Sequence, residues 1–263
     1  MSRRIVITSG KGGVGKTSVA ANLGMKLSKT HRVIVMDTDI GLNNLDMALG
    51  VENRVVYDLV DCIEGRCRIK QALIDVPDYP GLSVLPSSHA LDLTASLSGL
   101  DEIAEKLSAL CDFVLIDCPA GVENGFYRSI SCATEAVVVT TPHISCVRDA
   151  GKVISILKSR FENVSLLVNR ARGDLMVAGK MMSVEEIVSL LSVSLIGVIP
   201  EDDAVSVSQA SGGEVRQGIA ADALDLAVTN IINRENYIYD CTKRYRGLFG
   251  SVRKNLRILY NRG

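Results

Sequence analysis

The sequence predicts an α/β fold in which helices flank both faces of a doubly wound, mainly parallel β-sheet. One observation behind this prediction is that short β-branched runs alternate along the chain with longer segments of helical character. A second is that several runs, among them 33–36, 113–116 and 136–139, are apolar at every position. This composition is typical of strands that helices cover on both sides.

The elements follow one another in a regular order. The first strand is the apolar run at 5–8, and a glycine-rich stretch separates it from a helix that starts near Thr17. The runs at 33–37 and 113–117 both end in an aspartate, which marks the carboxyl end of each strand. We expect strands at 4–9, 33–37, 82–86, 113–117, 136–140, 164–168 and 195–199. We expect helices at 17–29, 45–49, 56–63, 67–73, 101–110, 124–132, 146–159, 184–191, 204–209 and 219–233.

The charge distribution divides the chain into a body and a tail. The net charge is only −1, but the segment 243–263 contains seven basic residues and no acidic ones, which leaves 22 basic against 30 acidic residues elsewhere. A basic end on an acidic body indicates an anionic partner for that end. We expect one domain over 1–235, large enough to bury a substantial core, and a tail over 236–263.

The cysteines and the N-terminus indicate a cytoplasmic chain. There are seven cysteines, an odd number, and no C-x-x-C pair, so we expect reduced thiols. A metal or iron–sulfur site is the alternative, although the spacing of Cys62 and Cys67 fits no such motif. The start of the chain lacks the features of a signal peptide, and no apolar stretch approaches 18 residues.

Residues 10–17 read Gly-Lys-Gly-Gly-Val-Gly-Lys-Thr, which matches the phosphate-binding pattern G-x-x-x-x-G-K-[ST]. The pattern lies between an expected strand and an expected helix, where backbone N–H groups and the helix N-terminus suit a polyphosphate. Lys16 can reach the terminal phosphates, and the Thr17 hydroxyl can ligate Mg²⁺. A glycine-rich turn without a ligand is the alternative. The candidate phosphate-binding residues are Gly10, Lys11, Gly12, Gly13, Val14, Gly15, Lys16, Thr17 and Ser18.

Three aspartates at strand ends complete the expected nucleotide site. Asp117 is expected to hold Mg²⁺ directly or through a water, together with Thr17 and Asp39. Asp39 is also expected to orient or activate the attacking water, with support from Asp37. The alternative is that these acids only cap the helices that follow. The second loop lysine, Lys11, could neutralise charge during phosphoryl transfer in a neighbouring subunit, or it could be an exposed loop residue.

The stretch 11–18 resembles the deviant Walker A motif of one group of SIMIBI-type P-loop ATPases, which includes the MinD and ParA proteins. Further stretches resemble the MinD branch in particular: 37–46, 55–60, 117–125, 145–149 and 197–202. The resemblance implies an ATP-hydrolysing, Mg²⁺-dependent switch that forms a homodimer with ATP and helps to position the division septum. It leaves open a FlhG-like regulator of flagellar number and a ParA-like ATPase of DNA segregation.

The resemblance also implies roles for individual residues. Lys11, Lys16 and Asp39 would be catalytic, with Lys11 reaching across the dimer and Asp39 in switch I. The segment 117–121 would form switch II, and 145–149 would meet regulatory partners. Those partners would be a MinC-like division inhibitor and a topological-specificity factor of the MinE or DivIVA system. The expected adenine pocket comprises Asn169, Arg170, Pro200, Glu201 and Asp202.

The C-terminal tail has the pattern of a membrane-surface helix. If 243–262 is helical, its large apolar residues except Ile258 fall on one face and its basic residues on the adjoining face. We therefore expect binding to the anionic inner surface of the cell membrane. A helix packed on its own domain and an arm that binds DNA are the alternatives, and the apolar stripe disfavours DNA. The expected membrane contacts are Leu248, Phe249, Val252, Arg253, Lys254, Leu256, Arg257 and Leu259.

Overall fold

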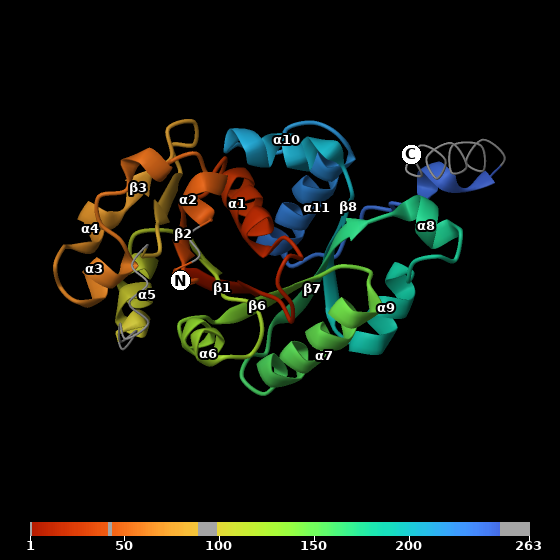
Figure 1. Ribbon diagram of the computed structural model, residues 1–263, viewed down its shortest axis with the longest axis horizontal. Helices are drawn as coiled ribbons and strands as arrows, with labels where there is room; N and C mark the ends of the chain where they lie inside the picture. Colours follow the sequence, from red (N-terminus) through yellow and green to blue (C-terminus); the bar gives the residue numbers. More distant parts are fainter. Residues whose placement is uncertain (1, 42–43, 89–98, 248–263) are drawn as a thin grey trace.

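The predicted alternation of strands and helices is confirmed. The computed structural model describes residues 2–41, 44–88 and 99–247 (Figure 1). Its strands are β1 (Arg3–Thr8), β2 (Val33–Asp37), β3 (Ile74–Asp75), β4 (Leu82–Leu85), β5 (Phe113–Asp117), β6 (Glu135–Thr140), β7 (Val164–Ala171) and β8 (Ser194–Pro200). They form one sheet in the order β3-β4-β2-β5-β1-β6-β7-β8, in which only the β3–β4 pair is antiparallel.

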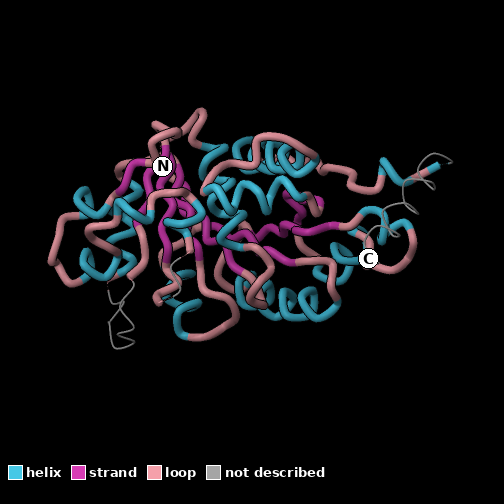
Figure 2. The backbone as a smooth tube through the Cα atoms, turned by 45° about the horizontal axis from the view of Figure 1, so that its top comes forward, coloured by secondary structure: helices cyan, strands magenta, loops and turns pink. Residues whose placement is uncertain are grey.

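Helices cover both faces of this sheet, so the strands lie between two helical layers (Figure 2). The α-helices are α1 (Lys16–Leu27), α2 (Leu45–Ala48), α3 (Leu59–Ile63), α4 (Ile69–Ala72), α5 (Leu100–Ser108), α6 (Asn124–Ser131), α7 (Ile144–Lys158), α8 (Gly173–Val177), α9 (Val184–Leu191), α10 (Asp203–Ser211) and α11 (Ile219–Asn233). Short 3₁₀ turns lie at η1 (Glu52–Arg54) and η2 (Lys243–Tyr245).

Alternate side chains of the strands point into two separate hydrophobic cores, one on each face of the sheet. In β1, Ile5 and Ile7 belong to the core that also contains residues of α1 and α11, whereas Val6 belongs to the core on the other face, with residues of α5, α6, α7 and α9. Successive side chains of a strand point to opposite faces, so a strand covered on both sides must be apolar throughout. This is the physical reason that the uniformly apolar runs identified the fold.

The structure adds elements that the sequence pattern did not reveal. The strand β3 has two residues, too few to show a periodicity, and it pairs at the sheet edge, where the Ser83 hydroxyl also donates to Asp75 at 2.7 Å. The helix α8 is little more than one turn and was also missed. The helix expected at 56–63 begins only at Leu59, because Asp58 accepts the backbone N–H of Asp61 and caps the helix there.

An ion cluster with a buried Lys26–Glu214 pair at its centre joins α1 to α11 and to the loop before α11. The Lys26 ammonium lies 3.1 Å from the Glu214 carboxylate and 2.7 Å from that of Asp225, and Lys29 lies 2.6 Å from Glu214. The side chains of Lys26 and Glu214 are only 2% and 3% exposed. Burial alone would raise the pKa of Glu214, but the hydrogen bonds from Lys29 and Lys26 outweigh it and lower that pKa.

The segment after α11 returns to the body before it reaches the tail. The amide of Asn230 bonds the N–H and the carbonyl of Tyr237, and Cys241 is buried next to Met176. A Cβ on Gly173 would lie 1.9 Å from the Cys241 carbonyl oxygen, so glycine is required for this contact.

The helix expected from 243 onwards does not begin there. The 3₁₀ turn η2 ends at Tyr245 and Arg246 is extended, so helical structure starts only at Gly247. The expected membrane contacts from Leu248 to Leu259 lie outside the described residues. Within the part that is described, no helix is both long and apolar enough to cross a bilayer.

We predict that Glu214→Gln lowers the free energy of unfolding by about 3 kcal/mol at neutral pH, because it leaves a buried ammonium with one partner fewer. Chemical denaturation would measure this change. The difference from wild type should shrink below pH 4.5, since a lowered carboxyl pKa contributes stability only while the group is ionised. Glu102→Gln, in an exposed pair with Lys106, is the control and should barely alter the midpoint. Equal effects of the two substitutions would contradict the prediction.

Candidate nucleotide site at the phosphate loop

The phosphate loop joins β1 to α1 and is held from two sides. Gly10 lies against the backbone of α7, where an added Cβ would come within 2.3 Å of the Asp149 carbonyl carbon. Gly15 has a φ of +92°, and a Cβ there would lie 2.5 Å from the Asn169 amide nitrogen. Close contacts therefore require glycine at both positions, and the left-handed backbone conformation is a second requirement at Gly15. Val14, between them, is buried in the core on the α1 side.

The side chains expected to bind phosphate and metal meet at the start of α1. Lys16 is buried to 8% exposure, and the Thr17 hydroxyl lies close enough to the Asp117 carboxylate to lower the pKa of that group. Asp117 is only 2% exposed, yet its Oδ1 has no hydrogen-bond partner within residues 2–41, 44–88 and 99–247. A buried carboxylate oxygen without a partner is costly unless a cation or water satisfies it. This oxygen, next to a hydroxyl, suits the oxygen-rich shell of Mg²⁺.

The three aspartates are packed closely enough to affect one another's ionisation. Asp37 and Asp117 are register partners in the parallel β2–β5 pair. Burial and then the charge of Asp117 raise the pKa of Asp37 well above its ordinary value. Burial raises the pKa of Asp117 to about 6, although the Thr17 hydrogen bond and Lys16 oppose the rise. Burial also raises the pKa of Asp39, against the charge of Lys16. The ionised cluster would therefore be stabilised by a divalent cation.

Hydrogen bonds tie the two expected switch segments to this cluster. The Thr38 hydroxyl lies 2.7 Å from the Asp117 carbonyl oxygen and 2.8 Å from the Ser129 hydroxyl on α6. The Asp39 N–H donates to the Asp37 carboxylate at 2.9 Å. On the other side, the Gly121 N–H donates to the Ser9 carbonyl at 3.0 Å. The sequence did not identify Thr38 and Ser129, because no local pattern connects positions so far apart.

The expected adenine-side residues have defined structural partners. The Asn169 side chain donates to the Val14 carbonyl at 2.8 Å and accepts the Arg170 N–H at 2.9 Å, so it links β7 to the phosphate loop. Arg170 has a left-handed φ of 54° at the irregular end of β7. The Asp202 carboxylate accepts the N–H of Ala204 at 3.0 Å and that of Ala220 at 3.1 Å, at the starts of α10 and α11.

Asp202 is thus a cap for two helices in addition to any contact with a base. The sequence could have indicated the first cap, since an aspartate just before a helical run is a start signal. The neighbouring residues of the expected pocket are fixed as well: Pro200 is buried, and Glu201 lies 3.3 Å from the Arg172 guanidinium. Contacts of these residues with adenine stay a prediction.

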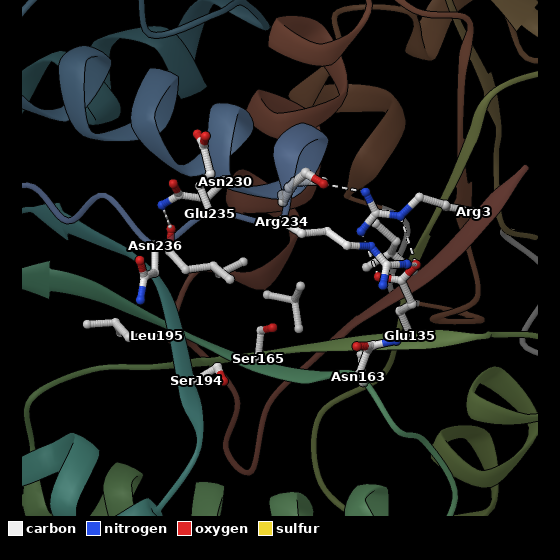
Figure 3. A pocket seen from close by; sticks show the side chains of 15 residues that line it. Arg3, Glu135, Asn163, Ser165, Ser194, Leu195, Asn230, Arg234, Glu235 and Asn236 are labelled. Atoms are coloured by element: carbon white, nitrogen blue, oxygen red, sulfur yellow. Dashed lines mark hydrogen bonds and ion pairs between the residues drawn. The ribbon is translucent and has the colours of Figure 1, made fainter.

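A hollow of about 300 Å³ lies at the end of the sheet opposite the phosphate loop, where β1, β6, β7 and β8 begin. Figure 3 shows the guanidinium groups of Arg3 and Arg234 converging on Glu135 at one end, with Asn230 and Asn236 at the other. Arg3 binds both carboxylate oxygens of Glu135, at 2.7 and 2.6 Å. The residues expected to bind nucleotide do not line it. We interpret the ion pairs that line this hollow as contacts that hold the end of α11 to the amino ends of the strands.

Comparisons with known proteins identify the family. A model of the CobQ/CobB/MinD/ParA nucleotide binding domain matches residues 5–215. The septum site-determining protein MinD of Bacillus subtilis (strain 168) is 44% identical over 240 residues, which cover 89% of this chain and 89% of that protein. A putative septum site-determining protein MinD of Chlorella vulgaris is 40% identical over 262 residues, with 97% and 93% covered. The chain belongs to the MinD family.

Solved structures agree with this membership. A MinC:MinD cell division protein complex of Aquifex aeolicus superposes with a TM-score of 0.84 and 36% identity, covering 90% of this chain and 99% of that one. MinD of Pyrococcus horikoshii, complexed with Mg-ADP, gives a TM-score of 0.81 and 30% identity, with 88% and 96% covered. The predicted resemblance is confirmed, and this MinD-family chain is a nucleotide-binding ATPase of septum site determination.

We predict that Asp117→Asn stabilises the nucleotide-free protein at pH 7 by about 1–3 kcal/mol. Folding raises the pKa of Asp117 from 3.8 to about 6, so ionisation of this group makes the folded protein less stable as the pH rises through that interval. Asparagine cannot ionise and therefore removes this destabilisation. The gain should be smaller at pH 5, where the folded wild type is largely protonated.

The measurement is chemical denaturation at both pH values, with the exposed loop substitution Asp78→Asn as the control. In the same variant, the added thermal stability that Mg-ADP gives to the wild type should be largely lost. An Asp117→Asn protein that was less stable than wild type at pH 7 would contradict the proposed origin of the pKa shift.

Proposed function

We propose that this chain is a Mg²⁺-dependent ATPase switch that dimerises with ATP, binds the inner membrane surface and recruits division regulators to determine the septum site. The observation that carries the proposal is the unpaired Oδ1 of Asp117 beside the Thr17 hydroxyl, at the mouth of the phosphate loop. This pair supplies two of the oxygen ligands that a Mg²⁺ ion on ATP requires. The Mg-ADP complex of the Pyrococcus horikoshii relative supports a Mg²⁺-bound adenine nucleotide as the ligand of this site.

The roles of the other site residues follow from their positions. Lys16, buried beside Asp39 and Asp117, would bind the terminal phosphates and offset the carboxylate charge. Asp39 is half-buried, and its backbone is held by the Asp37 carboxylate, which would place it to orient water. Mg²⁺, when bound with ATP, would polarise the phosphate oxygens.

Lys11 supports the dimer part of the proposal. It is exposed at the start of the loop, and an added Cβ on the neighbouring Gly12 would meet nothing within 4 Å. This part of the loop is therefore open to a second copy of the chain, whose triphosphate Lys11 would contact. A cation supplied in this way stabilises the charge that develops during phosphoryl transfer.

The basic, amphipathic composition of 248–263 supports the membrane part of the proposal. One short helix binds a bilayer weakly, because ordering it costs backbone entropy that its apolar contacts only partly offset. Two tails on one dimer would bind together, since the second binds intramolecularly. ATP would therefore control membrane residence by controlling dimerisation. For the regulators, the support is the MinC:MinD complex of the Aquifex aeolicus relative and the exposed start of α7 around Ile144.

We predict that Lys11→Ala abolishes ATP-dependent dimerisation and lowers turnover by about 10³-fold while ADP binding persists, because Lys11 acts across the dimer. Lys16→Ala should instead lose nucleotide binding itself. Light scattering with ATP, titration with ADP and steady-state phosphate release would separate the two. Lys70→Ala, on the exposed face of α4, is the control. A Lys11→Ala protein that still dimerised with ATP would overturn the trans role.

We predict that a chain ending at Gly247 fails to sediment with vesicles of anionic phospholipid in the presence of ATP. This end point retains the buried Cys241 and so leaves the body intact. Within the full chain, Leu256→Ala should weaken binding about tenfold, because it removes apolar contact from both tails of a dimer. Ile258→Ala is the matched control, since Ile258 lies off the apolar face. Equal losses for the two variants would argue against an amphipathic helix at the membrane.

A further inference from the structure

Two of the seven cysteines lie side by side. The Sγ atoms of Cys62 and Cys67 are 3.5 Å apart, and both thiols are free. Cys62 belongs to α3 and is buried in the hydrophobic core, whereas Cys67 is half-exposed. Of the remaining cysteines, only Cys146 is also half-exposed, and the other four are buried.

The chain between the two thiols is a tight turn that brings them together. The helix α3 ends at Ile63, and Gly65 adopts a φ of +72°, which reverses the chain direction. The Gly65 N–H donates to the Cys62 carbonyl at 3.3 Å, and the Arg66 N–H donates to the Asp61 carbonyl at 2.9 Å. These bonds place Cys67 over the last turn of α3. The turn itself is exposed, so a small side-chain rotation can close the remaining gap to the S–S bond length of about 2.0 Å.

A metal does not explain the pair. Within the residues that the structure describes, no group of three or more His, Cys, Asp or Glu side chains could hold an ion. The nearby carboxylates are already engaged: Asp58 and Asp61 accept each other's backbone N–H groups at 3.0 Å and cap α3. Asp61 also accepts the Arg66 guanidinium at 2.6 Å.

We propose that Cys62 and Cys67 are a modification site, at which exchange with a low-molecular-weight disulfide forms a reversible intramolecular disulfide. Intracellular disulfides of this kind are usually transient and redox-sensing, and they require two thiols within reach of one another. The C-x₄-C spacing by itself gives no such indication, because it does not show that a turn folds one sulfur back onto the other.

The exchange has a defined order. The half-exposed Cys67 thiolate attacks one sulfur of the small disulfide, which forms a mixed disulfide at Cys67 and releases one small thiolate. Cys62 then attacks the Cys67 sulfur, its proton passes to the departing second thiolate, and the protein disulfide and two small thiols remain. Cys62 is not the first nucleophile, because burial and the neighbouring Cys67 raise its pKa to about 12. Two electrons pass from the protein thiols to the small disulfide.

The test uses the full chain in buffers of reduced and oxidised glutathione, with free thiols alkylated at the end point. Trypsin cleaves after Arg54, Arg66 and Arg68, so the disulfide joins the fragments 55–66 and 67–68, which separate on reduction. We expect this joined species at a glutathione disulfide concentration at least about tenfold below that which half-modifies Cys146, because the second step is intramolecular.

Single substitutions test the order of attack. Cys62→Ser should arrest Cys67 as a stable mixed disulfide, and Cys67→Ser should leave Cys62 unmodified. Because Cys67 is half-exposed, Cys67→Ser retains the core even if Cys62→Ser disturbs folding. Cys146→Ser is the matched control and should leave oxidation of the pair unchanged.

Three results would overturn the proposal. One is a wild-type chain in which Cys67 keeps its glutathione while Cys62 is alkylated. Another is a pair that stays reduced when Cys146 is fully modified. The third is a disulfide between two chains, seen as a dimer on a non-reducing gel.

Discussion

The site depends on carboxylate groups that the fold holds together against their mutual repulsion. Parallel pairing of β2 with β5 puts Asp37 and Asp117 at the same level of the sheet, under the start of α1 and out of contact with water. The sheet register fixes this arrangement, so moving one side chain does not remove the repulsion between the two carboxylates. Lys16 and the Thr17 hydroxyl compensate part of the charge, and one oxygen of Asp117 is left for a cation. The limited stability of the nucleotide-free protein and the Mg²⁺ binding that we propose for it therefore have the same physical origin.

The phosphate loop is held in its shape by contacts from both sides. The backbone of α7 touches Gly10, and the amide of Asn169 bonds Val14 and leaves no room for a side chain at Gly15. A loop that is already shaped loses little conformational entropy when it binds phosphate. The same Asn169 was expected from family resemblance to contact adenine, so one side chain would connect the base side of the pocket to the phosphate side.

Much of the fold and the outline of the site were predictable, because they follow from local patterns. Uniformly apolar runs identified the buried strands, and the octet at 10–17 located the loop. The two-residue β3 and the one-turn α8 could not be found, since neither is long enough to show a period. The bond between Thr38 and Ser129, the double cap at Asp202 and the closeness of Cys62 to Cys67 depend on how distant or reversed segments meet. No sequence spacing encodes those meetings.

The contact between Gly10 and α7 has a mechanical consequence. Backbone meets backbone there, with no flexible side chain between the loop and the helix to absorb a displacement. The outer surface of the same helix begins with Ile144, which is 77% exposed. If a protein bound that end of α7 and displaced the helix, the displacement would be transmitted directly to the phosphate loop, without any contact with the nucleotide. A partner bound outside the site would then change the rate of turnover through α7 alone.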